Sequence, residues 1–379
     1  MKPVSDPGFI TVRLDKLSGR RWGGDVAVEV RDPKTFALRA RGIVGEPLNV
    51  PAGKHWVSAI LPNGEQLSAD ESVSIGVGEA REVLLNWTDA DVPASMETGA
   101  WVDRTRRAAD ILAPAWQLFT RVFAAQIRGN WLAARMGTSP MPERDRVSNL
   151  TMDAAFGDLP VLLEVASGNE LPTYFAVPID GEKGRTTSEW QYDDATKQVK
   201  IRFDFHDDEL NTFFDYVQVG FAQEARSISR RLISQAEEYA EDRKSPLRAV
   251  LAAYVLLRAN ETEGLQAWSR RLSDQYAWLP DGVALRIECL ARDGKHREAA
   301  ELMPELVARG APWFRSGVAY VAARAKLYST VRATPSSNFT LAPETHQLIA
   351  RLAGEMDTLM ASLDLNEMIS VYRDLPRLT

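Results

Sequence analysis

Apolar and polar residues alternate along the N-terminal part of the chain, between about residues 8 and 87. Turn residues such as Gly23-Gly24, Asp32-Pro33 and Pro62-Asn63-Gly64 separate the short alternating runs. A period of two, interrupted by turn signals about every ten residues, is typical of a small antiparallel β-sandwich. The pattern therefore predicts strands at Thr11–Leu14, Val26–Val30, Trp56–Ile60, Val73–Ile75 and Val83–Leu85.

The middle of the chain changes from helical to strand-like spacing. Between residues 99 and 136, large apolar residues such as Phe119 and Phe123 recur at helical spacing, and Pro114 predicts a kink or break. Alternating runs return between residues 159 and 205, around a predicted hairpin turn at Asp193–Thr196. We expect a second small β segment here. The pattern leaves open whether it forms its own sheet or extends the first one.

From Asp207 onward the pattern predicts only helices. One long amphipathic helix is expected from about Asp208 to Arg243, and its apolar stripe must pack against another part of the fold. Farther along, a shift of 34 residues superimposes two helix–turn–helix segments, with Leu256 falling on Leu290 and Asn260 on Gly294. Tetratricopeptide repeats have this period, stack their apolar faces and expose a groove. Two copies alone also leave open a chance pair of helical hairpins.

These patterns predict an α+β protein of three parts. They are an N-terminal antiparallel β-sandwich over residues 1–90, a helical linker with a small antiparallel β segment over 91–206, and an all-α, tetratricopeptide-like repeat domain over 207–379. A chain of 379 residues is long enough for two or three such cores.

Composition narrows the classes of partner. The net charge of −7 argues against non-specific binding to nucleic acid, which requires a basic surface. The single cysteine gives no intrachain disulfide, and the sequence has neither a signal-peptide pattern nor an apolar run of membrane-spanning length. We therefore expect a cytoplasmic protein.

One stretch of the predicted sandwich resembles a known family. Residues Leu48 to Val57, with the turn Pro51-Ala52-Gly53, followed by Pro62-Asn63-Gly64, are similar to the late hairpin of transthyretin-like or carboxypeptidase-regulatory-like domains. The resemblance extends over residues 8–87 and implies a non-catalytic β-sandwich.

A second resemblance concerns residues 245 to 328. An ordered series that includes Trp268, Trp278-Leu279-Pro280-Asp281-Gly282 and Gly310-Ala311-Pro312-Trp313-Phe314 resembles the helical region beside caspase-like peptidase domains in bacterial multidomain proteins. The peptidase signatures, a His-Gly run after a strand and a cysteine at a strand end, are missing. The resemblance therefore implies a separate caspase-like or related peptidase as protein partner, in a bacterial defence-type system, and no peptidase activity in this chain.

Reactive residues are few. Cys289 lies between apolar residues in a predicted helix, which indicates a packed core thiol. The cluster His206-Asp207-Asp208-Glu209 contains possible metal ligands, but Asp207 or Asp208 is better interpreted as a helix N-cap. Short catalytic and phosphate-binding motifs are lacking. We expect no catalytic, cofactor-binding or metal-binding residues and no enzyme activity, although an active site built from scattered carboxylates in a deep polar pocket is a further hypothesis.

The leading hypothesis is an adaptor or regulatory subunit that binds a protein partner. Five residues are the candidates for partner contact, with core filling as the competing interpretation of Trp278 and Trp313: Trp268, Trp278, Asp281, Trp313 and Phe314.

The alternative is a target or effector that a partner protease cuts. Its candidate cut sites are the loops Gly137–Arg146 and Ser329–Thr340, and its fragments would act on a further partner or on a membrane. The arginine-rich segment 101–136 is expected to pack in the core, with contact to an anionic membrane as the less favoured interpretation.

Overall fold

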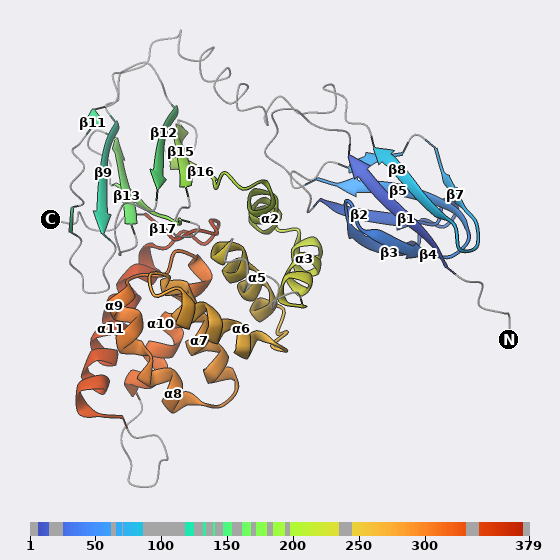
Figure 1. Cartoon of the computed structure of the whole chain (residues 1–379). Helices are drawn as coiled ribbons and strands as arrows, with labels where there is room; N and C mark the ends of the chain where they lie inside the picture. Colours follow the sequence, from blue (N-terminus) through green and yellow to red (C-terminus); the bar gives the residue numbers. More distant parts are fainter. Residues whose placement is uncertain are drawn as a thin grey trace. The chain divides into compact units, whose positions relative to one another are not determined.

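The computed structural model divides into two compact units, each described separately below (Figure 1). Met1–Arg104 and Asp207–Ile228 form the first unit, and Thr105–His206 and Ser229–Thr379 form the second. Residues 207–228 therefore cluster with the N-terminal strands, although the sequence pattern groups them with the helical repeats. The structure describes residues 7–14, 26–61, 66–69, 71–85, 118–124, 132–133, 139–140, 147–153, 161–167, 172–179, 185–193, 198–234, 245–330 and 341–373.

The strands of the first unit form the sandwich. Their bounds are β1 (Gly8–Leu14), β2 (Ala27–Arg31), β3 (Leu38–Ile43), β4 (Pro47–Val50), β5 (Gly53–Ile60), β6 (Gln66–Ser68), β7 (Val73–Ile75) and β8 (Ala80–Leu85). One sheet has the order β4-β1-β8 and the other β3-β2-β5-β6, with β7 also paired to β5. Alternating apolar positions of both sheets, including Ile10, Val28 and Val57, form its core. All five predicted strands are confirmed.

Two features of the sandwich differ from the prediction. The alternating pattern does not predict strands β3, β4 and β6, and β3 is half-exposed along most of its length. The pair β1–β8 is parallel, with Val12 opposite Val83, whereas the other described pairs of this unit are antiparallel. The resemblance to transthyretin-like domains stays a prediction, and the turn Pro62-Asn63-Gly64 on which it partly rests lies outside the described residues.

Two helices follow the N-cap at Asp207, whose side chain accepts hydrogen bonds from the amides of Glu209 (2.9 Å) and Leu210 (3.0 Å). This confirms the predicted cap. The single long helix expected from Asp208 to Arg243 is wrong: α2 (Asp208–Val219) ends at Gly220, whose φ of 93° is left-handed, and α3 (Ala222–Ser234) begins beyond it. A glycine adopts this conformation without a Cβ clash. Residues 235–244 lie outside the described part of the chain.

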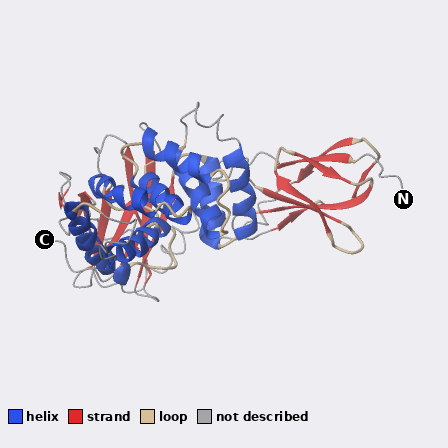
Figure 2. Cartoon of the chain, turned by 90° about the horizontal axis from the view of Figure 1, so that it is seen from below, coloured by secondary structure: helices blue, strands red, loops and turns tan. Residues whose placement is uncertain are grey.

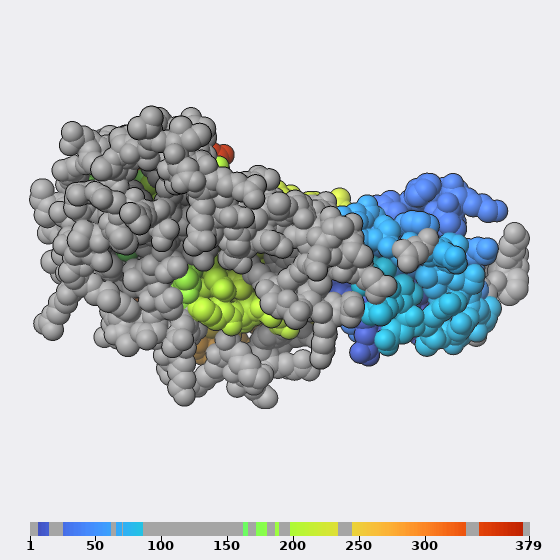
Figure 3. Space-filling view, turned by 90° about the horizontal axis from the view of Figure 1, so that it is seen from above, coloured from blue at the N-terminus to red at the C-terminus, as the bar shows by residue number. Residues whose placement is uncertain are grey.

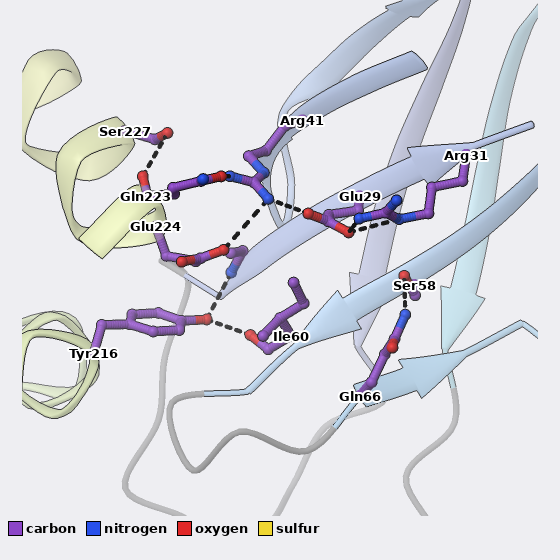
Figure 4. Close-up of polar contacts among 11 residues, drawn as sticks. Glu29, Arg31, Arg41, Ser58, Ile60, Gln66, Tyr216, Gln223, Glu224 and Ser227 are labelled. Carbon is purple, nitrogen blue, oxygen red and sulfur yellow. Dashed lines mark hydrogen bonds and ion pairs between the residues drawn. The ribbon is translucent and has the colours of Figure 1, made fainter. Parts of the chain in front are cut away.

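Polar contacts fasten α2 and the first half of α3 to the sandwich (Figure 4). The buried Tyr216 hydroxyl accepts from the Ala27 amide (2.8 Å) and donates to the Ile60 carbonyl, at the point where these two residues lie opposite each other on β2 and β5. It thus bridges two strands of the same sheet. In Figure 3 the sandwich surface is blue and the visible surface of α2 and α3 yellow-green.

The carboxylate of Glu29 is the centre of the neighbouring ion cluster. It binds Arg31 (2.6 Å) and Arg41, and Arg41 also lies 3.6 Å from Glu224 of α3. Burial raises the pKa of Glu29, but the hydrogen bonds and charges of Arg41 and Arg31 outweigh burial and leave this pKa below its ordinary value. The cluster therefore keeps its charges while it holds α3 against β2 and β3.

The role of Tyr216 gives a testable prediction. Y216F removes only the hydroxyl, so the Ala27 amide and the Ile60 carbonyl lose their shared partner. We expect the free energy of unfolding of the first unit to fall by about 1–3 kcal/mol, the cost of buried unsatisfied groups. Amide hydrogen exchange should accelerate at Ala27. S227A, which removes a hydroxyl bonded to the Gln223 carbonyl on an exposed face of α3, is the control without such a loss. Unchanged exchange at Ala27 in Y216F would contradict the bridge.

The strands of the second unit form sheets of their own (red in Figure 2). One sheet contains β10-β9-β13-β14-β17, with β11 paired to β9, and the other contains β12-β15-β16. The described pairs of the predicted second β segment are all made within these sheets, so this segment does not extend the sandwich. The bounds are β9 (Leu118–Ala124), β10 (Leu132–Ala133), β11 (Ser139–Pro140), β12 (Val147–Asp153), β13 (Val161–Ser167), β14 (Thr173–Val177), β15 (Arg185–Asp193), β16 (Gln198–Asp204) and β17 (Val371–Tyr372).

The helix predicted between residues 99 and 136 is wrong at β9. All seven residues of β9 pair with β13, from Leu118 opposite Ser167 to Ala124 opposite Val161. Aromatic and β-branched residues, which β9 contains in Phe119, Val122 and Phe123, favour strands when a partner strand is present. The pairing partner lies about forty residues away, which local spacing does not reveal. Residues 101–117, with Arg104 and Pro114, lie outside the described residues, as do 141–146 and 331–340 of the predicted cleavable loops.

The helices of the second unit repeat the first helix and the turn of the predicted 34-residue unit. Their bounds are α5 (Pro246–Arg258), α6 (Leu265–Gln275), α7 (Pro280–Arg292), α8 (His296–Glu301), α9 (Met303–Arg309), α10 (Arg315–Thr330) and α11 (Pro343–Ser362). α5 and α7 have the same length at a shift of 34 residues. Their ends match as well. Asn260 and Gly294 both have positive φ, and the next amide in each copy bonds the carbonyl of Leu256 or Leu290 at 2.9 Å.

Among the described helices, none combines the length and the apolar character needed to cross a bilayer.

Candidate functional site

A pocket opens where α6 packs beside the start of α5 and the end of α3. Its volume, including space open to solvent, is about 480 Å³. Its wall is mostly apolar and aromatic, as is usual for binding sites in proteins. We call it the α5–α6 pocket and define it by its described lining residues: Leu232, Ser245, Pro246, Arg248, Ala249, Trp268, Arg271, Leu272, Gln275 and Tyr276.

Local sequence fixes the wall of this pocket. Pro246 occupies the first turn of α5, where the missing amide hydrogen costs nothing and the fixed φ favours a helix start. Trp268 of α6 is nearly buried, and its indole Nε1 donates to the carbonyl of Ala249 at 3.1 Å. This bond holds the indole plane against α5. The pocket wall is therefore set by the helix pair itself.

The charges of the α5–α6 pocket are all of one sign. Its described lining contains Arg248 and Arg271 and no Asp or Glu. Arg248 is buried, whereas Arg271 is half-buried at the wall. The lining also lacks histidine and cysteine among its described members, so no nucleophile with an adjacent base lies there. The arrangement can bind an anionic, partly apolar group.

A second polar centre lies in the interior, at Asp281 in the first turn of α7. Its carboxylate accepts hydrogen bonds from the Tyr254 hydroxyl (2.7 Å) and from the amides of Trp313 (2.7 Å) and Phe314 (3.3 Å), just before α10. These contacts join α5, α7 and the start of α10. Asp281 thus fixes the two residues that lead into α10.

Burial dominates the titration of this centre. Burial raises the pKa of Asp281 to about 7, although the hydrogen bonds from Trp313, Tyr254 and Phe314 favour the charged form. Burial, together with the nearby Asp281, raises the pKa of Tyr254 well above its ordinary value. A buried acid with a raised pKa is also found at catalytic sites. Here the carboxylate oxygens of Asp281 accept hydrogen bonds from residues that hold helices together.

Glu288 is a further buried carboxylate with a structural role. It accepts from Arg292 Nε (2.7 Å) and from Arg324 Nε (2.8 Å), and so links α7 to α10. Arg292 also donates to the Leu257 carbonyl (2.8 Å) at the end of α5. The carboxylate of Glu288 thus offsets part of the positive charge of the two arginines inside the stack.

The structure places the five predicted partner-binding residues in different surroundings. Trp268 lines the α5–α6 pocket. Trp278 is half-buried, with its ring centroid 5.8 Å from that of Trp313. Asp281, Trp313 and Phe314 are buried and hold helices together. Trp278 is therefore the most exposed of the five residues, whereas Trp268 is buried although it lines the pocket. Partner binding by these residues stays a prediction.

Other candidates lie where the sequence predicts them. Cys289 is buried in α7, and burial raises the pKa of its thiol to about 11, so it is a packed core thiol. His206 is exposed, with Nε2 2.9 Å from the Thr187 hydroxyl. Among the described residues, no group of three possible metal ligands comes together. Sequence reasoning missed Arg248, Arg271 and Tyr276, because a lone arginine or tyrosine on an amphipathic helix resembles any solvated residue.

Comparison with known proteins concerns the helical region. Residues 212–352 match the family model of the Y4kD C-terminal domain. The match begins in α2 and ends in α11, so it includes the α5–α6 pocket and all five predicted partner-binding residues, but it covers little more than a third of the chain. No curated protein and no solved structure matches the chain significantly.

The raised pKa of Asp281 predicts a pH-dependent stability. In the unfolded chain an aspartate loses its proton near pH 4, whereas the folded chain retains this proton up to about pH 7. Between these values folding takes up a proton, so stability falls as pH rises, by at most about 1.4 kcal/mol per pH unit. We expect the free energy of unfolding of the wild type to fall relative to D281N from about pH 4 to about pH 7, and no further above that.

The measurement is chemical denaturation at several pH values. D274N, at an exposed aspartate that pairs with Arg286, is the control and should not reproduce this fall. A constant difference between wild type and D281N over the whole range would contradict a raised pKa.

The packing around Asp281 is tested by a substitution at Gly317, with Gly354 as the control position. A Cβ on Gly317 of α10 would lie 2.4 Å from the Tyr254 hydroxyl and 2.8 Å from an Asp281 carboxylate oxygen. We expect G317A to lower the free energy of unfolding by about 1–3 kcal/mol through overpacking. A Cβ on Gly354 of α11 would meet nothing within 4 Å, so G354A should raise stability by about 0.5–1 kcal/mol. Equal effects of both changes would contradict the tight contact at Gly317.

Proposed function

We propose that this chain is a non-catalytic interaction protein, an adaptor or regulatory subunit that docks a protein partner on its stacked helices. The observation that carries the proposal is the α5–α6 pocket, whose described lining combines Trp268, Tyr276 and two arginines with apolar residues. Tryptophan, tyrosine and arginine are the residues that contribute most often to binding energy at interfaces.

The surrounding helices support an interaction role. Repeats of helical hairpins form extended surfaces whose exposed positions vary without loss of the fold. The buried carboxylates Asp281 and Glu288 are occupied by contacts that join helices. Their chemistry therefore serves the scaffold, and the α5–α6 pocket offers contact surface rather than reactive groups.

A peptidase is the first partner to test. This choice rests on the resemblance of residues 245 to 328 to helical regions beside caspase-like peptidases, which also motivates a defence-type setting in the cytoplasm. The lining of the pocket supports a protein partner and gives no indication of that partner's activity.

The experiment is cross-linked capture with the full chain in its native host, followed by reconstitution with the purified partner. We expect a stoichiometric complex, a change in the partner's own activity when the chain is added, and an intact chain by mass spectrometry. Charge reversal in the pocket wall, R271E, should weaken the complex at least about tenfold, because a charge-assisted contact is replaced by repulsion.

The control is R270E, at an exposed arginine on the same helix that pairs with Asp274 instead of lining the pocket. Specific cleavage of the chain by the captured peptidase would favour the cleaved-target alternative over an adaptor. Turnover of a small substrate by the purified chain, with no stoichiometric partner, would contradict both.

A further inference from the structure

The α5–α6 pocket concentrates positive charge in an acidic protein. The chain has a net charge of −7, yet the described lining contains two arginines and no carboxylate. Most arginines of the helical stack are neutralised within it. Arg286 pairs with Asp274 and Arg297 with Glu301, and Arg309 pairs with Glu305. The pocket is thus a local departure from the pattern of its surroundings.

Arg271 differs from the paired arginines of the helical stack. Within the described part of the chain it makes no hydrogen bond and no ion pair, whereas its neighbour Arg270 lies 3.5 Å from Asp274. A guanidinium presents several donors in one plane and binds a carboxylate through two parallel hydrogen bonds. A half-buried guanidinium at a pocket wall binds such a group more strongly than a fully solvated one, because water competes less.

A hydroxyl on the opposite helix adds a second polar contact. Ser245 precedes α5 as its N-cap residue, but its side chain makes no capping hydrogen bond. Its Oγ is buried and has no hydrogen-bond partner. A buried hydroxyl without a partner costs free energy that a ligand recovers by accepting its hydrogen. Ser245 and Arg271 line the same pocket, Ser245 from the position before α5 and Arg271 from α6.

Five apolar residues form another part of the wall, which Arg248, Gln275 and Tyr276 also line. Leu232, Trp268 and Leu272 line it from α3 and α6, and Pro246 and Ala249 line it from α5. A ligand that places only a carboxylate here would leave this apolar surface in contact with water. An occupant with a carboxylate beside an aliphatic or aromatic side chain uses both parts of the wall.

We propose that the α5–α6 pocket binds a short acidic segment of the partner protein, in which a Glu or Asp carboxylate contacts Arg271 and the Ser245 hydroxyl and a neighbouring Leu- or Phe-type side chain packs against Trp268 and Leu272. This inference rests on the proposed docking function and names the chemistry of its partner. The charge of the pocket, opposite to that of an acidic peptide, selects this occupant over a neutral or basic one.

The test uses fluorescein-labelled, capped hexapeptides that contain a Glu-Leu or Glu-Phe pair among Ser and Gly residues, with Gln-Leu and Gln-Phe counterparts. Binding to the full chain is measured by fluorescence anisotropy. We expect the Glu peptides to bind, and the Gln peptides to bind about tenfold more weakly, because a charge-assisted hydrogen bond is lost.

Variants locate the site. R271Q should weaken binding of the Glu peptides by about tenfold, and R271K by less, because lysine keeps the charge but loses the planar pair of donors. R270Q, at the exposed ion pair with Asp274, should stay within about twofold of wild type. Circular dichroism and the Gln-peptide affinity check that each variant remains folded.

Three results would overturn the inference. They are equal affinity for Glu and Gln peptides, an equal loss in R270Q and R271Q, and competition by glutarate as strong as by the peptide, which would indicate a site for a small acid. Failure of all peptides to bind folded wild type would also overturn it. The docking function is judged by the partner complex. If a captured complex survives R271Q, the docking function stands and this inference fails. If the peptides bind but no partner complex is found, this inference stands and the docking function fails.

Discussion

The hydrogen bonds of one buried carboxylate, Asp281, hold the helical stack in register. Tyr254 comes from α5, Asp281 from α7, and the amides of Trp313 and Phe314 from the segment before α10. The same segment bonds the C-terminal part of the chain, since the Ser370 amide donates to the Trp313 carbonyl at 2.7 Å. That part leads into β17, which pairs with β14. The single contact network therefore connects the helices of the second unit to its larger sheet.

The same reasoning explains why the α5–α6 pocket differs from the rest of the stack. Contacts between helices, such as the ion pair of Glu288 and Arg324, join opposite charges inside the stack. Trp268 is fixed by its bond to Ala249, so the adjoining wall does not depend on any of these ion pairs. Arg271 makes no ion pair within the described residues, and a wall fixed in this way fits the proposed docking role, because little order remains to be lost on binding.

Sequence pattern predicted those features that depend on nearby residues. The cap at Asp207, the strands of the sandwich and the repeat ends at Asn260 and Gly294 are all set within a few positions. The pattern did not predict β9, which is a strand because the distant β13 pairs with it. It also did not predict the end of α2 at Gly220, because the apolar stripe continues past this local glycine signal. The sequence pattern did not predict the α5–α6 pocket either, because its lining combines residues from α3, α5 and α6 that are distant in the sequence.

The two repeat copies share the residues that start and pack their helices and differ at the α5–α6 pocket. At a shift of 34 residues, Pro246 corresponds to Pro280 and Leu272 to Leu306, so the positions that start and pack the helices are kept. Arg271 corresponds to Glu305, and Gln275 to Arg309, and these two residues of the second copy form an ion pair. Arg309 then donates to the Ser273 carbonyl at 2.8 Å and so closes one copy against the next. At this repeat position the second copy thus has a glutamate that pairs with Arg309, and the first copy has an arginine in the wall of the α5–α6 pocket, where we propose that a partner binds.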